Sequence, residues 1–227
     1  MSAALDLHPE AMALSASYRL SEQGVTIGGN ERIDFKRYPF IPRIIDAHAR
    51  RMTIVKSAQL GVSIACLLKA LEGARTENLR GILYGFPSDR EVQDFSKARL
   101  APILQQNAHV WGDSIGDADS AGLRQIGGTN LYFRGIGQKG ASAAKSLSPI
   151  KSIPADWLFL DERDEMDDAR VDAVEHRLDG SRCPEQTCLS TPTLPEYGVD
   201  LDYKASSQSV WQWQCPLCNG STCLAET

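Results

Sequence analysis

The chain has 227 residues, a net charge of −5 at pH 7, 42% hydrophobic residues and 23% charged residues. This composition is typical of a folded globular protein, and the length suits one domain with a small appendage. The negative net charge excludes a protein that coats nucleic acid through bulk positive charge, although it is compatible with a local basic segment. The sequence has no apolar stretch long enough to cross a membrane and no signal peptide, so we expect a cytoplasmic protein without a membrane partner.

The pattern of the sequence divides the chain into three parts. Residues 1–36 are weakly patterned, and we expect a helical or disordered lead-in. Residues 37–205 alternate apolar stretches with helical periodicity, which predicts an α/β domain with a largely parallel central sheet flanked by helices. Residues 206–227 contain a closely spaced pair of cysteines and would begin a small appendage or a linker.

An aromatic and a basic residue, Tyr38 and Arg43, precede the first predicted strand. They are suited to stacking on an adenine ring and to hydrogen bonding with it. The equal alternative is that residues 37–49 anchor the first helix of the domain through apolar contacts.

Residues 53–63 read as a short buried strand, a tight loop and a hydroxyl residue that opens a helix, as in a phosphate-binding P-loop. Gly61 and Ser63 match the pattern G-x-x-x-x-G-K-[ST]. Val62 stands in place of its lysine, and Lys56 in place of its first glycine. The predicted nucleotide-binding loop consists of Lys56, Ser57, Ala58, Gln59, Leu60, Gly61, Val62 and Ser63. A strand-turn-helix without a ligand is the alternative.

The next segments predict a helix, a strand and a second helix. Residues 63–74 have apolar side chains at the spacing of one helix face, and residues 81–86 read as a strand. Ser88 and Glu91 form a capping-box pattern for a helix that we expect to end near residue 106.

Residues 121–155 contain no acidic residue, and part of this segment, residues 123–134, reads as a hairpin with Gly127-Gly128 as its turn. The basic residues of the segment are Arg124, Arg134, Lys139, Lys145 and Lys151. Glycine-rich basic loops bind the phosphate backbone of nucleic acids, so this segment is a candidate DNA contact. A solvated loop without a partner is the equal alternative.

Residues 156–162 form an apolar stretch that ends in two adjacent carboxylates, Asp161 and Glu162. A continuous apolar stretch is typical of a strand buried on both faces of a parallel sheet, and such sheets bind ligands at their carboxyl ends. In a P-loop enzyme Asp161 would hold Mg²⁺, and Glu162 would orient and deprotonate the attacking water. The alternative is that residues 161–168 are the solvated acidic start of a helix.

Two of the six cysteines, Cys215 and Cys218, have the spacing of a metal knuckle. A closed structural zinc site needs four ligands, and only Cys223 follows these two in the sequence. We therefore leave open whether the knuckle binds Zn²⁺ or no metal. Cys66 falls on the apolar face of a predicted helix and is expected in the core.

Taken in order, segments of the chain resemble the ATPase part of tailed-phage terminase large subunits, specifically the lambda-like type. They are RYPFIPRIIDA, KSAQLGVS, ILYGFPSDREVQDFSKARLAPIL, ASAAKSLSPIK, DWLFLDERDEM, LSTPT and WQCPLCNG. The resemblance implies a P-loop NTPase that binds ATP and Mg²⁺ and uses ATP hydrolysis to move double-stranded DNA into a procapsid. The implied partners are the terminase small subunit, the portal protein of the procapsid and further copies of this chain in a ring, in the cytoplasm of the bacterial host.

The resemblance also implies roles for individual residues. Lys56 would neutralise charge on the β- and γ-phosphates. Ser63 and Asp161 would bind Mg²⁺, and Glu162 would be the catalytic base. Val62 departs from many relatives, which carry a second lysine there, and this leaves hydrolysis dependent on Lys56 alone.

Two further roles follow from the same resemblance. The motif that couples hydrolysis to movement corresponds to Ser190, Thr191 and Pro192. Arg177 would be an arginine finger that stabilises charge in the transition state, with a structural ion pair as the alternative.

Terminases of this type continue into a nuclease domain, and we expect this chain to stop before it. The carboxylates after Thr193 are Glu196, Asp200, Asp202 and Glu226. They form no dense cluster, so nuclease activity is not expected. Two other functions are kept as alternatives: a helicase-like DNA-dependent ATPase, and a non-catalytic zinc-knuckle protein that binds DNA or assists assembly.

Overall fold

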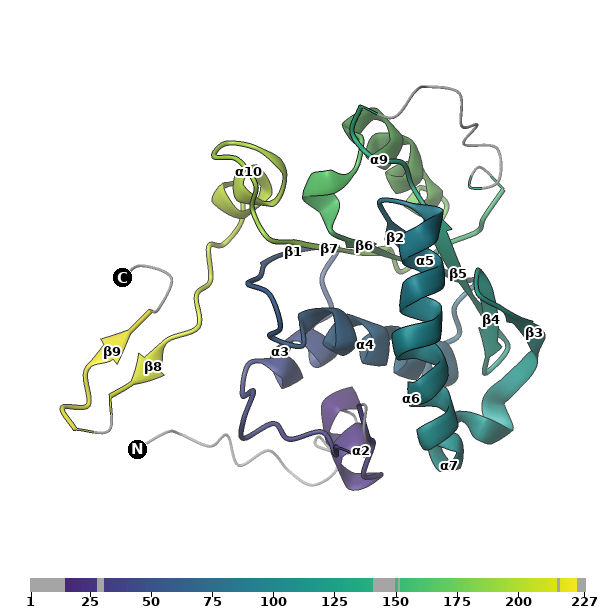
Figure 1. The fold of residues 1–227 in the computed structure, drawn as a ribbon, viewed down its shortest axis with the longest axis horizontal. Helices are drawn as coiled ribbons and strands as arrows, with labels where there is room; N and C mark the ends of the chain where they lie inside the picture. Colours follow the sequence, from purple (N-terminus) through teal and green to yellow (C-terminus); the bar gives the residue numbers. More distant parts are fainter. Residues whose placement is uncertain (1–14, 28–30, 141–149, 151, 216, 224–227) are drawn as a thin grey trace.

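The structure is a computed structural model that describes residues 15–27, 31–140, 150, 152–215 and 217–223. At its centre is a seven-stranded sheet with the strand order β1-β7-β6-β2-β5-β4-β3 (Figure 1). In this order the strands are β1 (Arg51–Val55), β7 (Glu185–Ser190), β6 (Trp157–Asp161), β2 (Ile82–Phe86), β5 (Thr129–Gly135), β4 (Leu123–Ile126) and β3 (Ile115–Ser120). The strands from β1 to β5 pair in parallel, whereas β4 and β3 are antiparallel. The predicted α/β fold with a largely parallel sheet is thus confirmed.

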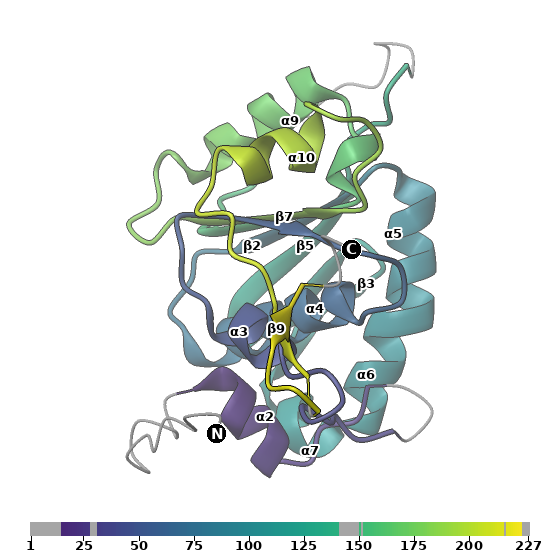
Figure 2. The same ribbon diagram turned by 90° about the vertical axis from the view of Figure 1, so that its left-hand side faces the viewer.

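Helices cover both faces of this sheet (Figure 2). One face carries α2 (Ala16–Glu22), α3 (Ile41–Asp46), α4 (Val62–Thr76), α5 (Asp89–Phe95), α6 (Ala101–Gln106) and α7 (Ala108–Trp111). The other face carries α9 (Asp168–Glu175) and α10 (Gly198–Lys204).

Alternate residues of the central strands contribute to two separate apolar cores. In β6, Trp157 and Phe159 belong to the core that includes α4, whereas Leu158 and Leu160 belong to the core that includes α9. This period of two is expected of a pleated strand. Every residue of β6 and β2 is buried, which explains why their sequences read as continuous apolar stretches.

Local sequence signals position several element ends. Gly127 and Gly128 have φ values of 59° and 84° in the predicted β4–β5 turn, a conformation that favours glycine. The Ser88 hydroxyl caps the start of α5 as predicted. The helix expected to continue to residue 106 is instead interrupted by a π-helical segment, Ser96–Leu100, just before Pro102. Proline lacks an N–H and crowds the preceding turn, which accounts for the interruption.

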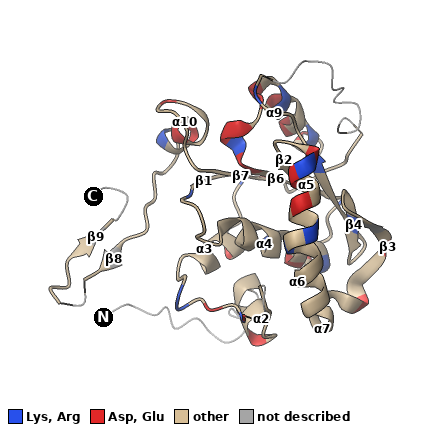
Figure 3. Ribbon diagram, viewed as in Figure 1, with Lys and Arg blue, Asp and Glu red and all other residues tan. Residues whose placement is uncertain are grey.

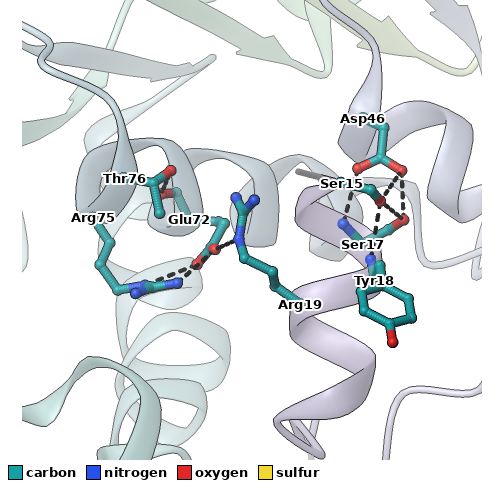
Figure 4. Close-up of polar contacts among 8 residues, drawn as sticks. All are labelled: Ser15, Ser17, Tyr18, Arg19, Asp46, Glu72, Arg75 and Thr76. Carbon is teal, nitrogen blue, oxygen red and sulfur yellow. Dashed lines mark hydrogen bonds and ion pairs between the residues drawn. The ribbon is translucent and has the colours of Figure 1, made fainter. Parts of the chain in front are cut away.

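Two carboxylates attach the N-terminal helix α2 to the domain (Figure 4). Asp46, at the end of α3, accepts a hydrogen bond from the Ser17 N–H at 2.9 Å. Glu72 of α4 is 1% exposed and accepts a hydrogen bond from Arg19 Nε at 2.7 Å. Leu20 of α2 is fully buried in the same core as α4. Part of the predicted lead-in therefore packs against the domain.

After α10 the chain continues to a small hairpin, β8 (Trp213–Gln214) and β9 (Ser221–Thr222), which lies apart from the main sheet in Figure 1. The Trp211 ring of this segment lies 6.2 Å from the Phe40 ring, measured between centroids. In the described part of the chain, no helix is both long enough and apolar enough to cross a bilayer.

Candidate active site

The predicted site residues lie at the carboxyl ends of β1, β7 and β6, where open parallel sheets bind ligands. Strand β7 lies between β1 and β6, so its last residue, Ser190, separates the two predicted motifs. The loop after β1 begins with Lys56, whose backbone N–H donates to the Ser190 carbonyl at 3.0 Å. This loop ends at Gly61, after which α4 begins. Strand β6 ends at Asp161.

The Lys56 side chain joins this loop to the carboxylate pair. Its ammonium donates hydrogen bonds to Glu162 Oε1 at 2.7 Å, to Asp161 Oδ1 at 3.1 Å and to Ser63 Oγ at 3.3 Å. The side chains of Lys56 and Asp161 are 10% and 5% exposed, whereas that of Glu162 is 37% exposed. The structure therefore brings together four residues that the sequence assigned to one site.

Burial and charge oppose each other in this cluster. Burial alone would lower the pKa of Lys56, but the Asp161 and Glu162 carboxylates outweigh it and raise this pKa. Burial raises the pKa of Asp161, although Lys56 and the Ser63 hydroxyl partly offset the effect. The Tyr84 hydroxyl donates to Asp161 Oδ2 at 3.2 Å, and burial together with that carboxylate raises the pKa of Tyr84 well above its ordinary value. Burial thus disfavours the charge on Asp161, and the neighbouring Lys56 ammonium favours it.

The loop between β1 and α4 has backbone donors that are available to a ligand. Two of its residues, Gln59 and Gly61, have left-handed φ values of 63° and 76° and turn the chain sharply. Residues 58–59 form a tight turn, and within the described part of the chain the N–H groups of residues 57–59 and 61 donate no hydrogen bond. The helix that follows, α4, is 15 residues long. Free N–H groups at the N-terminus of a long helix favour the binding of phosphate.

Val62, which stands where the usual motif has lysine, is 4% exposed and belongs to the core under the sheet. Its backbone can face a ligand in the loop, but its side chain cannot. From the sequence alone, Val62→Lys is expected to be tolerated or to raise the rate of hydrolysis. This expectation stays a prediction, and the burial of Val62 argues against it, because a lysine there would place an ammonium in an apolar core.

A cavity of about 160 Å³ lies beside the loop. Its lining includes Tyr38, from the segment before α3, together with Gln59, Leu60 and Gly61 of the loop. Arg43 is exposed on α3 and does not line this cavity. The structure therefore places Tyr38 in the lining of the cavity beside the loop, whereas Arg43 lies outside this cavity.

The backbone at Glu162 is left-handed, with φ 59° and ψ 48°, a conformation that is uncommon for residues other than glycine. The Ser190 hydroxyl oxygen lies 3.4 Å from Glu162 Oε2 and 3.2 Å from the Thr191 carbonyl oxygen, and its proton can be donated to either. Thr191 and Pro192 follow in an exposed loop. The first residue of the predicted coupling motif therefore contacts the predicted base.

Sequence reasoning missed Asp164, which is 1% exposed. It accepts hydrogen bonds from the Thr193 N–H at 3.0 Å and from the Val199 N–H at 2.8 Å. In the sequence it is one of several acidic residues between 161 and 168, and no local pattern separates it from its exposed neighbours. Its partners are 29 and 35 residues away along the chain, so only the folded structure reveals them.

Comparison with known proteins identifies the family. The model of the phage terminase large subunit gpA ATPase domain matches residues 30–225. The chain belongs to this family. No curated protein matches the sequence. The lambda-like type remains a prediction.

Solved terminase structures resemble the fold of this terminase domain. The HK97 bacteriophage large terminase has a TM-score of 0.57 and 13% identity, over 80% of this chain and 38% of that one. The Thermus phage P74-26 large terminase ATPase domain has a TM-score of 0.53 and 13% identity, over 78% of this chain and 73% of that one. The large terminase of thermophilic bacteriophage D6E has a TM-score of 0.50 and 14% identity, over 71% and 38%. The chain thus spans 38% of the D6E and HK97 proteins, and these matches support the P-loop NTPase fold.

Arg177 of this terminase domain lies away from the carboxylate pair. It is part of the 3₁₀ turn His176–Leu178, which follows α9. The neighbouring Glu175 pairs with Arg51 at the start of β1, at 2.6 Å. The candidate site lies at the other end of β1. The structure therefore does not bring Arg177 to the phosphate loop of its own chain.

Cys215 and Cys218 lie in the turn between β8 and β9. Hydrogen bonds from the backbone of Cys218, and to a lesser extent from that of Leu217, lower the pKa of the Cys215 thiol. Cys223 is buried after β9. Among the residues that the structure describes, no group of three or more His, Cys, Asp or Glu side chains could hold a metal ion. A zinc site is therefore not supported.

The three basic residues of segment 121–155 that the structure describes make contacts within the terminase domain, and the Arg124 guanidinium donates to the Ser120 carbonyl. Arg134 donates to two backbone carbonyl groups, and the Lys139 ammonium lies 3.4 Å from the centroid of an aromatic ring. Lys145 and Lys151 lie outside the described residues. Acidic and basic residues are interspersed on α5, α9 and α10 (Figure 3). A DNA contact through this segment stays a prediction.

Proposed function

We propose that this chain is the ATP-hydrolysing motor domain of a lambda-like phage terminase, which couples ATP hydrolysis to the movement of double-stranded DNA into a procapsid. The observation that carries the proposal is the contact of one lysine, Lys56, with Ser63 and with both carboxylates. A loop lysine, a hydroxyl at a helix start and strand-end carboxylates are the groups that P-loop enzymes use for phosphoryl transfer. Membership of the terminase ATPase family supports the same function.

The phosphates of ATP would bind at the start of α4. The N–H groups of residues 57–59 and 61, which have no acceptor among the described residues, would donate to phosphate oxygens, and the helix N-terminus adds a partial positive charge. Lys56 would then exchange part of its carboxylate contacts for contacts with the β- and γ-phosphates. The cavity beside Tyr38 would receive the adenine base, which an aromatic ring can stack upon.

Asp161 and Ser63 would hold Mg²⁺, an ion that usually binds one or two protein oxygens together with substrate phosphates and water. The bound ion would neutralise phosphate charge. Glu162 would accept the proton of the attacking water. Its side chain is 37% exposed and contacts the Ser190 hydroxyl, which suits a base that must reach a ligand in the loop.

The wider role follows from the family. We infer an ATPase domain over residues 37–205, a lead-in over residues 1–36 and the start of a further segment at residues 206–227. Ser190, Thr191 and Pro192 would couple hydrolysis to movement. The partners would be double-stranded DNA, the portal protein, the terminase small subunit and further copies of this chain in the host cytoplasm.

The test is ATP hydrolysis by the purified chain, with and without duplex DNA, for the wild type, Lys56→Ala and the exposed control Lys97→Ala. We expect hydrolysis that duplex DNA stimulates and a loss of about 100-fold or more in Lys56→Ala, because no other loop cation can face the transferring phosphoryl group. The control should match the wild type.

Three results would contradict parts of this proposal. The absence of hydrolysis in the wild type would contradict the motor. Lys56→Ala activity within a few-fold of the wild type would contradict the site. Unwinding of duplex DNA would indicate a helicase-like enzyme instead.

A further inference from the structure

Asp164 is a buried carboxylate two residues after the proposed base, in the 3₁₀ turn Arg163–Glu165. Its Oδ2 accepts hydrogen bonds from the Thr193 N–H at 3.0 Å and from the Thr193 hydroxyl at 3.2 Å. Its Oδ1 accepts a hydrogen bond from the Val199 N–H at 2.8 Å. All three donors come from the segment that leads from β7 into α10. A buried carboxylate is costly unless such donors satisfy it, so this segment and the turn hold each other in place.

A second set of contacts joins the same two segments at the proposed base. The Ser190 hydroxyl accepts from the Asp164 N–H at 3.3 Å, and its single proton faces both Glu162 Oε2 at 3.4 Å and the Thr191 carbonyl oxygen at 3.2 Å. Glu162 and the 3₁₀ turn that follows it thus contact the segment from β7 to α10 at three positions. These are Ser190 at the start of the segment, and Thr193 and Val199 further along it. A shift of the turn would act on that segment at several positions.

Gly198 makes the close approach to α10 feasible. It has a φ of +55°, and a Cβ atom built on it would lie 2.2 Å from Asp164 Oδ1. A side chain at this position would therefore displace the carboxylate as well as strain the backbone. Gly198 is the first residue of α10, and α10 packs against both β1 and the 3₁₀ turn.

We propose that Asp164 is a positioning residue that links the 3₁₀ turn after Glu162 to α10. Through this link, changes at the ATP site on nucleotide binding and hydrolysis are transmitted to α10 and to the segment beyond it. The proposal rests on the proposed ATPase function. It extends the coupling role from Ser190–Pro192 to Asp164, Thr193 and Gly198. Asp164 acts through its hydrogen bonds and not by contact with ATP.

The first experiment measures kcat and KM for ATP in Asp164→Asn, which places an amide NH₂ where one accepting oxygen faced a donor. We expect kcat to fall about 10-fold or more, with KM within about twofold of the wild type. Asp172→Asn is the matched control, because Asp172 is exposed on α9 nearby. The control should leave kcat unchanged.

A second pair of variants separates positioning from folding. Thr193→Val removes the hydroxyl donor and keeps the backbone donor, whereas Thr193→Ser keeps both. We expect kcat to fall several-fold in Thr193→Val and to stay within about twofold in Thr193→Ser, with the same thermal midpoint for both. An unchanged kcat in folded Asp164→Asn and Thr193→Val, or a loss that only follows the fraction of unfolded protein, would overturn the proposal.

A third measurement does not depend on turnover. Amide hydrogen exchange of residues 198–204 is followed in the wild type and Thr193→Val, with and without a non-hydrolysable ATP analogue. We expect the analogue to change exchange in the wild type by several-fold and the variant to lose most of this change. Exchange in α10 that is insensitive to the bound analogue, in a wild type that hydrolyses ATP, would overturn the link and leave the proposed function intact. A wild type that hydrolyses no ATP would instead contradict the proposed function.

Discussion

At the scale of single residues, the Lys56 ammonium faces two carboxylates, so its cluster has an excess of negative charge before any ligand binds. Two carboxylates beside a single ammonium favour the binding of a further cation. A nucleotide with its divalent ion would supply both a cation for Asp161 and phosphates for Lys56. The two carboxylates differ in exposure, with Asp161 at 5% and Glu162 at 37%, which suits different roles.

This difference predicts separable effects of substitution at Asp161 and Glu162. Glu162→Gln should lower kcat by about 100-fold or more and keep nucleotide binding, because the amide preserves the shape but cannot accept a proton. Asp161→Asn should instead weaken nucleotide binding in Mg²⁺ by about 10-fold or more. Titration with a fluorescent nucleotide, with and without Mg²⁺, and steady-state turnover measure the two effects. Asp94→Asn on the exposed side of α5 is the control. An equal loss of binding in both variants would show that the roles are not separate.

At the scale of elements, β6 carries a carboxylate just before its start as well as one at its end. Asp156 is 3% exposed and accepts hydrogen bonds from the Arg80 N–H at 2.7 Å and from the Ser181 hydroxyl at 2.7 Å. These contacts join two loops, the one before β2 and the one before β7, to the start of β6. Burial alone would raise the pKa of Asp156, but the hydrogen bonds from Ser181 and Arg80 outweigh it and lower the pKa.

We expect Asp156→Asn to lower the free energy of unfolding at pH 7 by about 2 kcal/mol, the typical contribution of hydrogen bonds to a charged group. The folded pKa lies below the unfolded value of about 3.9, so the folded state binds fewer protons between the two values. The stabilisation is therefore fully present above the unfolded pKa and is lost as the pH falls through the folded pKa. Urea unfolding of both proteins from pH 3 to pH 7 should show a difference that narrows below about pH 4. A difference that stays constant over this range would contradict the prediction.

At the scale of the whole molecule, two of the acidic residues after Thr193, Glu196 and Asp200, form surface ion pairs. Lys204 Nζ pairs with Glu196 at 2.5 Å and with Asp200 at 3.0 Å. Two-metal cleavage of DNA needs carboxylates that hold two ions within about 4 Å of each other. In the part of the chain that the structure describes, no group of three or more His, Cys, Asp or Glu side chains could hold a metal ion.

Because the carboxylates after Thr193 form no dense cluster in the sequence, we predict that the purified chain does not cut supercoiled plasmid DNA in Mg²⁺ or Mn²⁺. The measurement is conversion of supercoiled plasmid to the nicked and linear forms, resolved on agarose. Metal-dependent nicking that disappears when carboxylates after Thr193 are substituted would contradict the prediction.

The sequence by itself determined the elements whose signals are local. Continuous apolar stretches predicted β2 and β6, because strands buried on both faces have no polar side. The pair Gly127-Gly128 predicted the hairpin turn, because both residues need a positive φ. The grouping of Lys56, Ser63, Asp161 and Glu162 also followed, since loops at the carboxyl ends of parallel strands meet at one edge of the sheet.

Only the tertiary structure decided the strand order, the place of Arg177 and the burial of Asp164. The insertion of β7 between β1 and β6 brings Ser190 to Glu162, 28 residues away in the sequence. The burial of Asp164 depends on donors 29 and 35 residues away, and nothing in its own neighbourhood distinguishes it from the exposed acids beside it. Such contacts form only where separate elements pack together, so a local pattern of residue types cannot predict them.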